Sequence, residues 1–400
     1  MILQIRPRPK GSMRNKIKIL YHPEIFTLQK YGGISRYFYE LLSKFYEDRE
    51  IEFILPLAFS DNYYLKHASF IRCHNFLKPI KTKDKNQFLG LIGKPLRKIT
   101  KKIFRYQQDK NIIKLKEALK AQDFDICHLT YYNTKVLEYL GNKPLVITVY
   151  DMIHELFPEF FPNDPTPLYK DQLIKKARKI IAISNNTKQD LMKFYNIHED
   201  KIEVIYLSCS FNDQDLSAKK DSKLPRDYIL YVGERRNYKN FRFFIESIVS
   251  VFKDCTDLKL ICAGSQSFYD SEKELLQNLN LSKKVAHYPG SDEFLIELYK
   301  NAIAFVFPSL YEGFGIPVLE AFSAGCPVIC SNTSSFPEIA GDAALFFDPY
   351  DKDSIRDSVK SVISDNNLRI EMINKGYERI KDFSWQETAN RTKKLYKSVM

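Results

Sequence analysis

Short apolar runs alternate with longer amphipathic stretches from Lys16 almost to the end of the 400-residue chain. The runs are rich in Ile, Val, Tyr and Phe, which is typical of strands buried on both faces of a parallel sheet. The stretches between them carry apolar residues at helical spacing. Strands and helices that alternate in this way predict a doubly wound α/β fold.

The predicted strands form two groups, separated by a polar stretch. The first group is 17–21, 51–55, 126–129, 145–149, 180–183 and 203–206, and the second is 228–232, 258–262, 284–287, 303–307, 328–330 and 344–347. The stretch between the groups has few large apolar residues, as expected of a linker. At 44% hydrophobic residues, the chain can build two domains, each with its own core. We predict a first domain over 13–207, a linker over 208–226 and a second domain over 227–382.

The two ends of the chain carry separate signals. Residues 383–400 begin Phe383-Ser384-Trp385 and continue with helical spacing, and Ser384 is a good N-cap residue, so a C-terminal helix is expected there. Residues 1–12 end in Lys-Gly-Ser before a second methionine, Met13. We expect them to be an added leader outside the fold.

Residues 308–320 (PSLYEGFGIPVLE) combine a glycine turn with two carboxylates. The apolar run before them predicts a buried strand, and the residues after Gly315 predict a helix. Gly313 and Gly315 allow the backbone to approach a ligand, and the free N–H groups at a helix start favour phosphate. Glu312 and Glu320 can accept hydrogen bonds from sugar hydroxyls. Together these features predict a nucleotide-sugar pocket.

This segment resembles the E-x7-E signature of retaining glycosyltransferases of the GT-B fold, in particular glycosyltransferase family 4. Residues 321–328 (AFSAGCPV) and Pro337-Glu338 match the same family, and the resemblance covers almost all of residues 16–400. It implies two Rossmann-like domains that face each other across a crevice, with the C-terminal helix crossing back to the first domain. The donor would lie mainly on the second domain, and the acceptor would attack the face from which the diphosphate leaves.

The resemblance also assigns the donor site. Glu312 would position sugar hydroxyls and stabilise positive charge, and Glu320 would bind the ribose. Residues 231–241 (YVGERRNYKNF) resemble the segment that supplies an arginine and a lysine to the diphosphate, here Arg235 and Lys239 by register. Fixed cations stabilise the charge that develops on the leaving diphosphate. The remaining donor contacts on the second domain would be Tyr288, Gly313, Phe314, Gly315 and Ile316.

Two glycines and a serine of the first domain are further candidates for donor contacts. Gly32 and Gly33, in residues 31–36 (YGGISR), follow the first strand and open a helix, so their N–H groups could approach a diphosphate. A tight turn explains the glycine pair equally well. Ser184 follows a strand and could bind phosphate or sugar, or it could be the N-cap of the next helix.

Residues 149–155 (VYDMIHE) end a strand of the first domain and should face the crevice. Family members often carry a histidine directly before Asp151, close to the reacting sugar, and here that position is Tyr150. A tyrosine can donate a hydrogen bond to a sugar hydroxyl, but it is no proton relay at neutral pH. His154 is an alternative for that role, although a lone loop histidine is more often structural. Tyr150, Asp151, Glu312, Arg235 and Lys239 are thus the predicted catalytic residues.

The excess of positive charge is confined to residues 78–116. They contain 13 basic and two acidic residues, interleaved with apolar ones, in a chain of net charge +12. Such a basic amphipathic insertion can lie on an anionic membrane surface, with about 1 kcal/mol per basic residue. A solvated helix and a nucleic-acid patch are the alternatives. Because no nucleic-acid-binding motif accompanies the segment, no nucleic-acid partner is expected.

Other patterns bear on location and cofactors. The seven cysteines form no C-x-x-C pair, which favours a reducing cytosol, and neither an apolar run of spanning length nor a signal peptide is visible. A cytoplasmic protein, peripheral on the inner face of the membrane, is expected. Asp123 and Asp125 satisfy a D-x-D pattern, which binds a divalent cation in another glycosyltransferase fold, but they precede a strand. With Lys and Arg on the diphosphate, no metal and no cofactor besides the nucleotide sugar is expected.

The segments YGGISRYFYELL, DMIHELFPE and YKNF are similar to those of bacterial mannosyltransferases that build surface polysaccharides such as the O-antigen of lipopolysaccharide. The resemblance therefore implies transfer of mannose from GDP-mannose to a glycan, which we expect to be lipid-linked, while UDP-sugars, dTDP-rhamnose and other activated sugars remain open as donors. Two alternatives share the fold. One is a catalytically weak scaffold or membrane-binding subunit, suggested by Tyr150, and the other is a nucleotide-sugar epimerase, which needs no acceptor.

Overall fold

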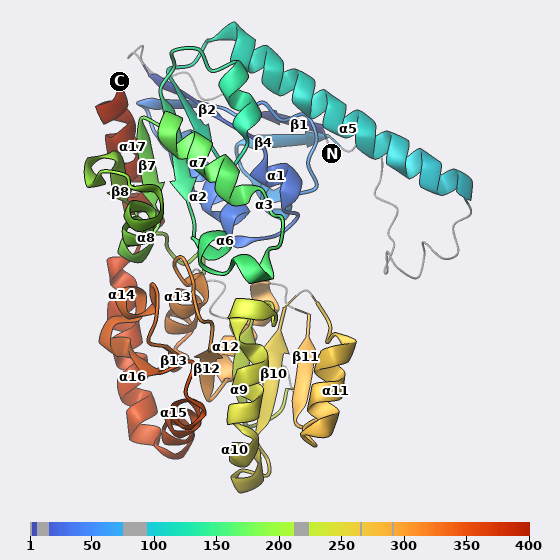
Figure 1. Ribbon diagram of the computed structural model, residues 1–400, viewed down its shortest axis with the longest axis vertical. Helices are drawn as coiled ribbons and strands as arrows, with labels where there is room; N and C mark the ends of the chain where they lie inside the picture. The colour runs from blue at the N-terminus through green and yellow to red at the C-terminus, as the bar shows by residue number, and fades with distance from the viewer. Residues whose placement is uncertain (1, 6–15, 75–93, 212–223, 265, 290–291) are drawn as a thin grey trace.

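The computed structural model describes residues 2–5, 16–74, 94–211, 224–264, 266–289 and 292–400. Two α/β domains are stacked along the long axis of the molecule (Figure 1). Each contains a six-stranded sheet whose neighbouring strands are parallel. The predicted fold class is confirmed.

The sheet of the first domain has the strand order β3-β2-β5-β6-β7-β8. Its strands are β2 (Ile17–Tyr21), β3 (Ile51–Ile54), β5 (Ile126–Leu129), β6 (Leu145–Val149), β7 (Lys179–Ala182) and β8 (Ile202–Val204). The helices are α1 (Ile25–Leu28), α2 (Gly33–Glu47), α3 (Tyr63–His67), α5 (Lys94–Ala121), α6 (Ile153–Leu156), α7 (Thr166–Lys176) and α8 (Asn185–Tyr195). Short 3-10 turns are η1 (Thr134–Glu138), η2 (Pro158–Phe160) and η3 (Glu199–Lys201).

The sheet of the second domain has the order β11-β10-β9-β12-β13-β14. Its strands are β9 (Tyr228–Val232), β10 (Lys259–Ala263), β11 (Val285–Tyr288), β12 (Ala304–Phe307), β13 (Val328–Ser331) and β14 (Ala344–Phe347). The helices are α9 (Phe241–Ser247), α10 (Val249–Asp254), α11 (Asp270–Asn278), α12 (Asp292–Asn301), α13 (Ile316–Ser323), α14 (Phe336–Ala340), α15 (Lys352–Ser364), α16 (Asn366–Arg379) and α17 (Trp385–Val399). The 3-10 turns are η5 (Asn237–Lys239), η6 (Gly341–Ala343) and η7 (Ile380–Asp382).

The strands lie where the apolar runs predict them. All twelve predicted strands are present, and β2, β5, β6, β9 and β14 have the predicted bounds. Every residue of β5, β6, β12 and β13 is buried, because helices cover both faces of each sheet. This double burial is the reason why continuous apolar runs marked the strands so clearly.

A pair of short strands lies outside the predicted pattern. Residues 2–5 form β1 (Ile2–Ile5), which pairs antiparallel with β4 (Ile71–His74). Residues 2–5 of the expected leader thus take part in the fold, whereas residues 1 and 6–12 lie outside the described chain. That residues 1–12 are an added leader stays a prediction. An edge pair of this kind depends on a partner about 70 positions away, so local pattern did not reveal it.

Helix α17 crosses back to the first domain, as expected, and packs along α2. Its N-cap is Ser384, whose side chain accepts a hydrogen bond from the Glu387 N–H. Tyr396, fully buried on α17, bonds at 2.6 Å to both the Tyr21 hydroxyl and His128 Nδ1. The C-terminal end of α17 lies beside the first sheet in Figure 1, where it is red.

The apolar core is continuous between the two domains, which differs from the expectation of two separate cores. One cluster of buried side chains includes residues of both sheets and of α17, and a second cluster fills the other side of the second domain. At the junction the Phe314 ring packs against Tyr206 and Phe383, with centroids 6.1 and 5.9 Å apart. The domains therefore share buried apolar surface in addition to polar contacts.

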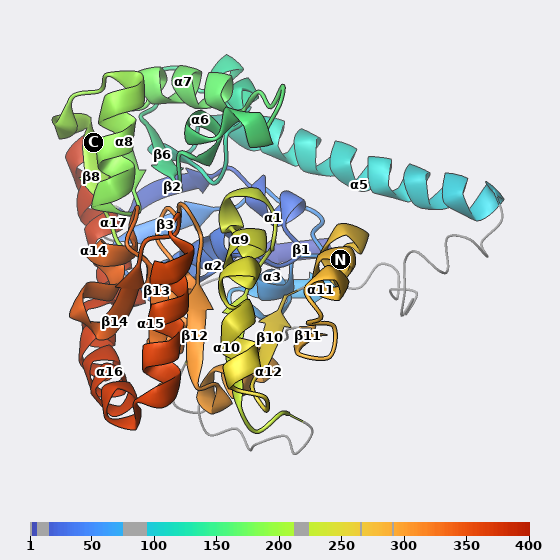
Figure 2. The ribbon, with the colours of Figure 1, turned by 60° about the horizontal axis from the view of Figure 1, so that its bottom comes forward.

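Helix α5 projects beyond the body of the first domain in both views (Figures 1 and 2). Its C-terminal part is fixed by Asn111, which bonds to the backbone of Ala58 and Phe59, and by Lys114, which donates to the Leu57 carbonyl. Residues 75–93 and the side chains of 94–104, which make up most of the predicted basic insertion, lie outside the described part. None of the described helices is long and apolar enough to cross a membrane.

Candidate active site

The candidate site lies at the carboxyl ends of β9 and β12, neighbours at which the strand order of the second sheet reverses. Ligands of open α/β sheets bind at such switch points. The loop after β9 brings Lys239 to this position, and the loop after β12 brings Glu312. Lys239 Nζ donates to Glu312 Oε1 at 2.6 Å. The structure thus joins two of the predicted catalytic residues in one ion pair.

The Lys239–Glu312 pair is largely withdrawn from solvent, with side chains 19% and 15% exposed. Burial by itself lowers the pKa of Lys239, but the negative charge of Glu312, with smaller contributions from Tyr238 and Asp151, raises it above its usual value. Lys239 is therefore a permanent cation at neutral pH. Asp151 comes from the first domain and lies beside the turn that follows Glu312, since a Cβ on Gly313 would be 3.2 Å from Asp151 Cβ.

The Gly313–Gly315 turn needs both of its glycines. A Cβ on Gly313 would lie 1.6 Å from the Tyr150 carbonyl oxygen, because the backbones of the two domains meet there. Gly315 has φ 99° and forms the N-cap of α13, a conformation that favours glycine. Ser335 fixes the turn by donating to the carbonyls of Glu312 and Phe314. The turn therefore combines close domain contact with an open helix start.

Glu320 is buried and bound to the first domain. Its Oε1 accepts from Arg36 Nη1 at 2.7 Å, and its Oε2 lies 3.3 Å from the Tyr299 hydroxyl. Arg36, on α2, also donates to the hydroxyls of Tyr64 and Tyr31. The predicted ribose-binding role of Glu320 stays a prediction, since the carboxylate serves here as an interdomain ion pair.

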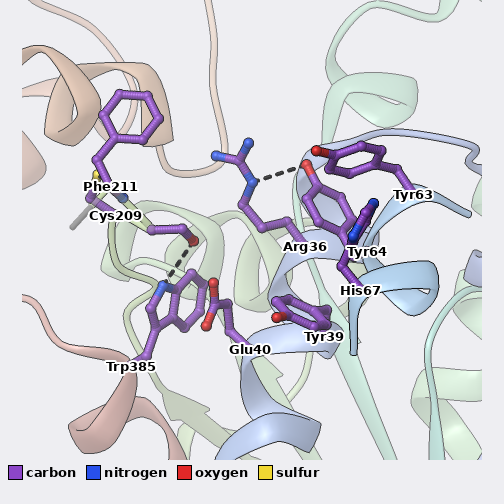
Figure 3. Close-up of a pocket in the computed structure, with 10 residues that line it drawn as sticks. Arg36, Tyr39, Glu40, Tyr63, Tyr64, His67, Cys209, Phe211 and Trp385 are labelled. Atoms are coloured by element: carbon purple, nitrogen blue, oxygen red, sulfur yellow. Dashed lines mark hydrogen bonds between the residues drawn. The ribbon is translucent and has the colours of Figure 1, made fainter. Parts of the chain in front are cut away.

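A cavity of about 310 Å³ lies between the domains above Glu320. It is lined by Tyr31, Gly32, Gly33, Arg36, Tyr64, Val232, Gly233, Ala263, Gly264, Leu295, Ile316, Pro317 and Glu320. The predicted donor residues Gly32, Gly33, Ile316 and Glu320 are therefore brought together. Arg36 and Tyr64 also line a neighbouring cavity of about 500 Å³, walled by aromatic side chains of α2 and α3 and by Trp385 (Figure 3).

Tyr288 and Phe314 contribute through their backbones. The Tyr288 carbonyl accepts from the Gly264 N–H, which places the end of β11 beside the 310 Å³ cavity. The Phe314 side chain is only 3% exposed and belongs to the apolar junction of the domains. The predicted donor contact of Phe314 stays a prediction, and with its side chain buried it would be made by the backbone of the Gly313–Gly315 turn.

The structure gives Tyr150 and Ser184 other partners than those predicted. The Tyr150 hydroxyl donates to the Thr130 carbonyl at 2.8 Å and is buried, so its single proton is committed within the first domain. Ser184, fully buried, accepts from the Thr187 N–H as the N-cap of α8. The structure thus shows the helix-cap alternative for Ser184. The contacts of Tyr150 with a sugar and of Ser184 with the donor stay predictions.

Arg235 is bound to α11 and to the loop that precedes it. Its guanidinium donates to Glu272 on α11 and to the carbonyls of Gln266 and Ser267, at 2.8 to 3.1 Å, and its side chain is 1% exposed. A buried arginine needs carboxylate and carbonyl partners, and α11 supplies the carboxylate while the loop before it supplies the carbonyls. The diphosphate contact of Arg235 stays a prediction.

Two other candidates have structural partners. His154 stacks on Phe161, and its Nε2 lies 3.6 Å from Asp164, so it is held within the first domain. Asp123 pairs with the Lys18 side chain at 2.6 Å, and Asp125 accepts from the Lys18 N–H at the start of β5. The D-x-D pattern is thus a loop-to-strand entry.

Sequence reasoning missed Arg36 as a site residue. It stands in the YGGISR segment, one helical turn from the glycines, and a charged residue at an otherwise buried helix position was the available signal. Its partner Glu320 lies 284 positions away, so the pair could not be identified before the domains were placed.

The matches to known families divide the chain as the sheets do. Residues 31–208 match the family described as "Glycosyltransferase Family 4", and residues 212–379 match "Glycosyl transferases group 1". The chain is 31% identical over 265 residues to an O-antigen chain mannosyltransferase B of Escherichia coli, which covers 63% of this chain and 70% of that protein. The chain belongs to the group 1 glycosyltransferases. This glycosyltransferase is also 31% identical over 245 residues to the O-antigen chain mannosyltransferase RfbU of Salmonella typhimurium, over 57% of this chain and 67% of that protein.

Solved structures of glycosyltransferases share the fold of this one. A glycosyltransferase from Rickettsia africae superposes with a TM-score of 0.66 at 18% identity, over 96% of this chain and 99% of the other. Anabaena Alr3699/HepE, in complex with UDP and glucose, superposes with a TM-score of 0.68 at 16% identity, over 96% of this chain and 100% of that one. The two-domain GT-B architecture of this glycosyltransferase is therefore established.

Proposed function

We propose that this glycosyltransferase moves a mannosyl group from GDP-mannose to a glycan with retention of anomeric configuration. The observation that carries the proposal is the Lys239–Glu312 ion pair at the switch point of the second sheet. Mannose is supported by the printed names of the two O-antigen mannosyltransferases that the chain resembles. GDP is the nucleotide favoured by the segments shared with such enzymes.

The ion pair suits a reaction in which a diphosphate leaves. Lys239 neutralises Glu312, and a donor diphosphate would compete for Lys239 and release the carboxylate toward the sugar hydroxyls. As the sugar–phosphate bond breaks, Lys239 would stabilise the negative charge on the leaving group, while Glu312 would stabilise positive charge on the sugar. The acceptor hydroxyl would attack the same face and give its proton to the leaving phosphate, so no covalent carboxylate intermediate is needed.

A divalent metal is not required by this scheme, because Lys239, a cation at neutral pH, would stabilise the charge that develops on the leaving diphosphate. Activity should therefore be the same in EDTA and in Mg²⁺. A loss of transfer in EDTA that Mg²⁺ restores would contradict this part of the proposal.

The deciding experiment measures both binding and chemistry. GDP-mannose, but not UDP-glucose or dTDP-rhamnose, should raise the melting temperature of the wild type, and Glu312→Ala should abolish that shift. Lys239→Met should lower the transfer rate by at least about 100-fold. NMR of the product should show an α-linked mannose. Stabilisation by none of the donors would favour the scaffold alternative, and turnover of the donor without an acceptor would favour an epimerase.

The acceptor is proposed to be a lipid-linked glycan, with the enzyme peripheral on the inner face of the membrane. The support is the basic amphipathic sequence that continues into the projecting helix α5. Replacing Lys94, Arg97, Lys98, Lys101 and Lys102 by Gln should abolish cosedimentation with phosphatidylglycerol vesicles and leave the thermal shift by GDP-mannose intact. Unchanged cosedimentation would refute the membrane contact.

A further inference from the structure

The first sheet has a switch point of its own, between β2 and β5. There the chain leaves β2 toward His22 and Glu24, and it leaves β5 toward Thr130 and Asn133. Thr130 Oγ1 bonds to both the His22 carbonyl and the Ile25 N–H, which fixes the two loops side by side. Because the second sheet carries the Lys239–Glu312 pair at its switch point, the matching position on the first sheet is where an acceptor would be sought.

A cavity of about 420 Å³ opens at this position. The sheet side contributes His22, Pro23, Glu24, Thr27, Leu28 and Asn133, the loop after β3 contributes Phe59, Ser60 and Asp61, and α5 contributes Gln107, Gln108, Asn111, Ile112 and Leu115. Asn111 holds the α5 wall in place through its bonds to Ala58 and Phe59. The described part of the helix that continues the basic segment is thus one side of the cavity.

Two polar atoms at the base of this cavity are buried without a hydrogen-bond partner among the described residues: His22 Nδ1 and Glu24 Oε2. They lie 4.0 Å apart, beyond hydrogen-bond distance, and His22 is 3% exposed. Asn133 donates to the other oxygen of Glu24 at 2.9 Å and so fixes the carboxylate. Buried polar atoms normally have a hydrogen-bond partner. A ligand group or a water that both donates and accepts hydrogen bonds could serve as the partner of this pair.

Burial keeps the histidine neutral. It lowers the pKa of His22 to about 4 and raises the pKa of the Glu24 carboxyl above its usual value. At neutral pH, His22 therefore presents an uncharged imidazole beside the Glu24 carboxyl group, which Asn133 holds in place. Hydroxyl groups suit both as partners, because a hydroxyl donates and accepts.

The lining selects a neutral sugar over a phosphate. It combines amide and carboxylate groups with apolar faces of Leu28, Phe59, Ile112 and Leu115, which suits the mixed polar and apolar surface of a hexose. Its described charged groups include the carboxylates of Glu24 and Asp61 and no Lys or Arg. A phosphate would be repelled by the two carboxylates.

The cavity and the Asp151 loop lie at the same edge of the first sheet. Asn133, which lines the cavity, follows β5, and Asp151 follows β6. Because β5 and β6 are neighbouring parallel strands, their carboxyl ends lie side by side. A sugar bound in the cavity would therefore lie on the first-domain side of the crevice, close to the donor side.

We propose that this cavity binds a neutral hexose of the acceptor glycan, with Glu24 and His22 as its hydrogen-bond partners and α5 as its outer wall. The assignment of that hexose to the acceptor rests on the proposed glycosyl transfer, whereas the binding of a neutral sugar in the cavity can be tested without it. Glu24 and His22 would determine acceptor specificity rather than take part in bond breaking.

The test uses the full chain and α-mannobiose as the probe, with saturation-transfer NMR for affinity and a transfer assay for KM. Glu24→Gln should weaken α-mannobiose binding about tenfold, since a charge-assisted hydrogen bond is lost. Gln108→Trp, which fills the cavity from an exposed position on α5, should do the same without disturbing the core. Glu117→Gln, an exposed glutamate of the same helix, is the matched control and should bind as the wild type does. In the transfer assay the acceptor KM should rise while the GDP-mannose KM stays constant.

Each outcome decides the inference. Binding that survives in Glu312→Ala but weakens in Glu24→Gln and Gln108→Trp supports it. Equal binding by all variants, loss in Glu312→Ala alone, or no binding of α-mannobiose by the wild type overturns it. If α-mannobiose binds in the cavity but no donor is ever turned over, the proposed function fails while the sugar site stands.

Discussion

Arg36 and Glu320 form a buried ion pair that joins the two domains, with side chains 7% and 6% exposed. Arg36 belongs to the glycine segment of the first domain, and Glu320 is the second glutamate of the E-x7-E pattern. Their 2.7 Å contact means that the motif residue predicted to bind ribose also holds the domains together. A ligand that binds Glu320 would have to compete with Arg36.

Removing one member of the Arg36–Glu320 pair should lower the stability of the protein. Arg36→Leu leaves Glu320 buried without its cation and should lower the free energy of unfolding by about 3–5 kcal/mol. Arg36→Leu with Glu320→Leu should recover much of the loss, because no uncompensated charge remains. Urea unfolding followed by the fluorescence of Trp385, the single tryptophan, measures this. Arg356→Leu, in a half-exposed pair with Asp353, is the control and should change the midpoint little. A double variant less stable than Arg36→Leu would contradict the argument.

At the scale of residues, the fold brings some predicted side chains together and gives others internal partners. Lys239 and Glu312 are oppositely charged residues on two loops that follow neighbouring strands, so their ion pair is consistent with the expected fold. Arg235, Tyr150 and Ser184 bond instead to Glu272, the Thr130 carbonyl and the Thr187 N–H. Such partners depend on side-chain direction, which sequence register does not give.

At the scale of elements, α17 is the connection that makes the two domains one unit. Its Tyr396 bonds to Tyr21 and to His128, and His128 also bonds to Thr148 at 2.9 Å. Lys393 of the same helix pairs with Asp48 at 2.7 Å. The helix was predictable from its N-cap and spacing, but the buried polar network beneath it was not.

The network makes stability depend on pH. Burial lowers the pKa of His128 to about 3, below its unfolded value of about 6.5. Below about pH 6.5 His128 takes up a proton in the unfolded state but not in the folded state. The free energy of unfolding therefore has its full contribution from His128 above about pH 6.5 and falls as the pH drops toward 3. Between pH 7.5 and pH 5 this histidine should cost about 2 kcal/mol.

His128→Gln tests this assignment. The variant should melt at a lower temperature at pH 7.5, because the bonds to Tyr396 and Thr148 are weakened, but its melting temperature should fall less between pH 7.5 and pH 5. His198→Gln replaces an exposed histidine and should follow the wild-type curve. An acid-induced fall that is as steep in His128→Gln as in the wild type would reject the role of His128.

At the scale of the whole molecule, several contacts close the crevice. The Gly313 backbone meets the Tyr150 carbonyl, and the Tyr311 hydroxyl bonds to Asp190 at 2.6 Å. The Glu338 carboxylate accepts from the N–H groups of Asn185 and Asn186 at the start of α8. An acidic group at a helix N-terminus is favoured by the helix dipole. These contacts bring the two domains together beside the Lys239–Glu312 pair, whose side chains are 19% and 15% exposed.

Gly313→Ala should hold the domains apart. Its Cβ would lie 1.6 Å from a backbone oxygen, so the clash cannot be relieved by a side-chain movement. Small-angle scattering should show a larger radius of gyration, and transfer should fall at least about 100-fold because the two halves of the site no longer meet. Gly33→Ala, whose Cβ would have its nearest neighbour at 3.8 Å, is the control for compactness. A variant Gly313→Ala as compact as the wild type would refute the clash.

The sequence by itself determined the twelve strands, the helix α17 and the loops that carry Glu312 and Lys239. These features depend on local hydrophobic pattern, glycine geometry and capping, all of which act over a few residues. The tertiary structure decided the rest: the Arg36–Glu320 pair, the inward turn of Arg235, the β1–β4 edge and the cavity between His22–Glu24 and α5. Each of these joins residues far apart in the chain, and the direction of a buried side chain follows from which partner can satisfy it at the least desolvation cost.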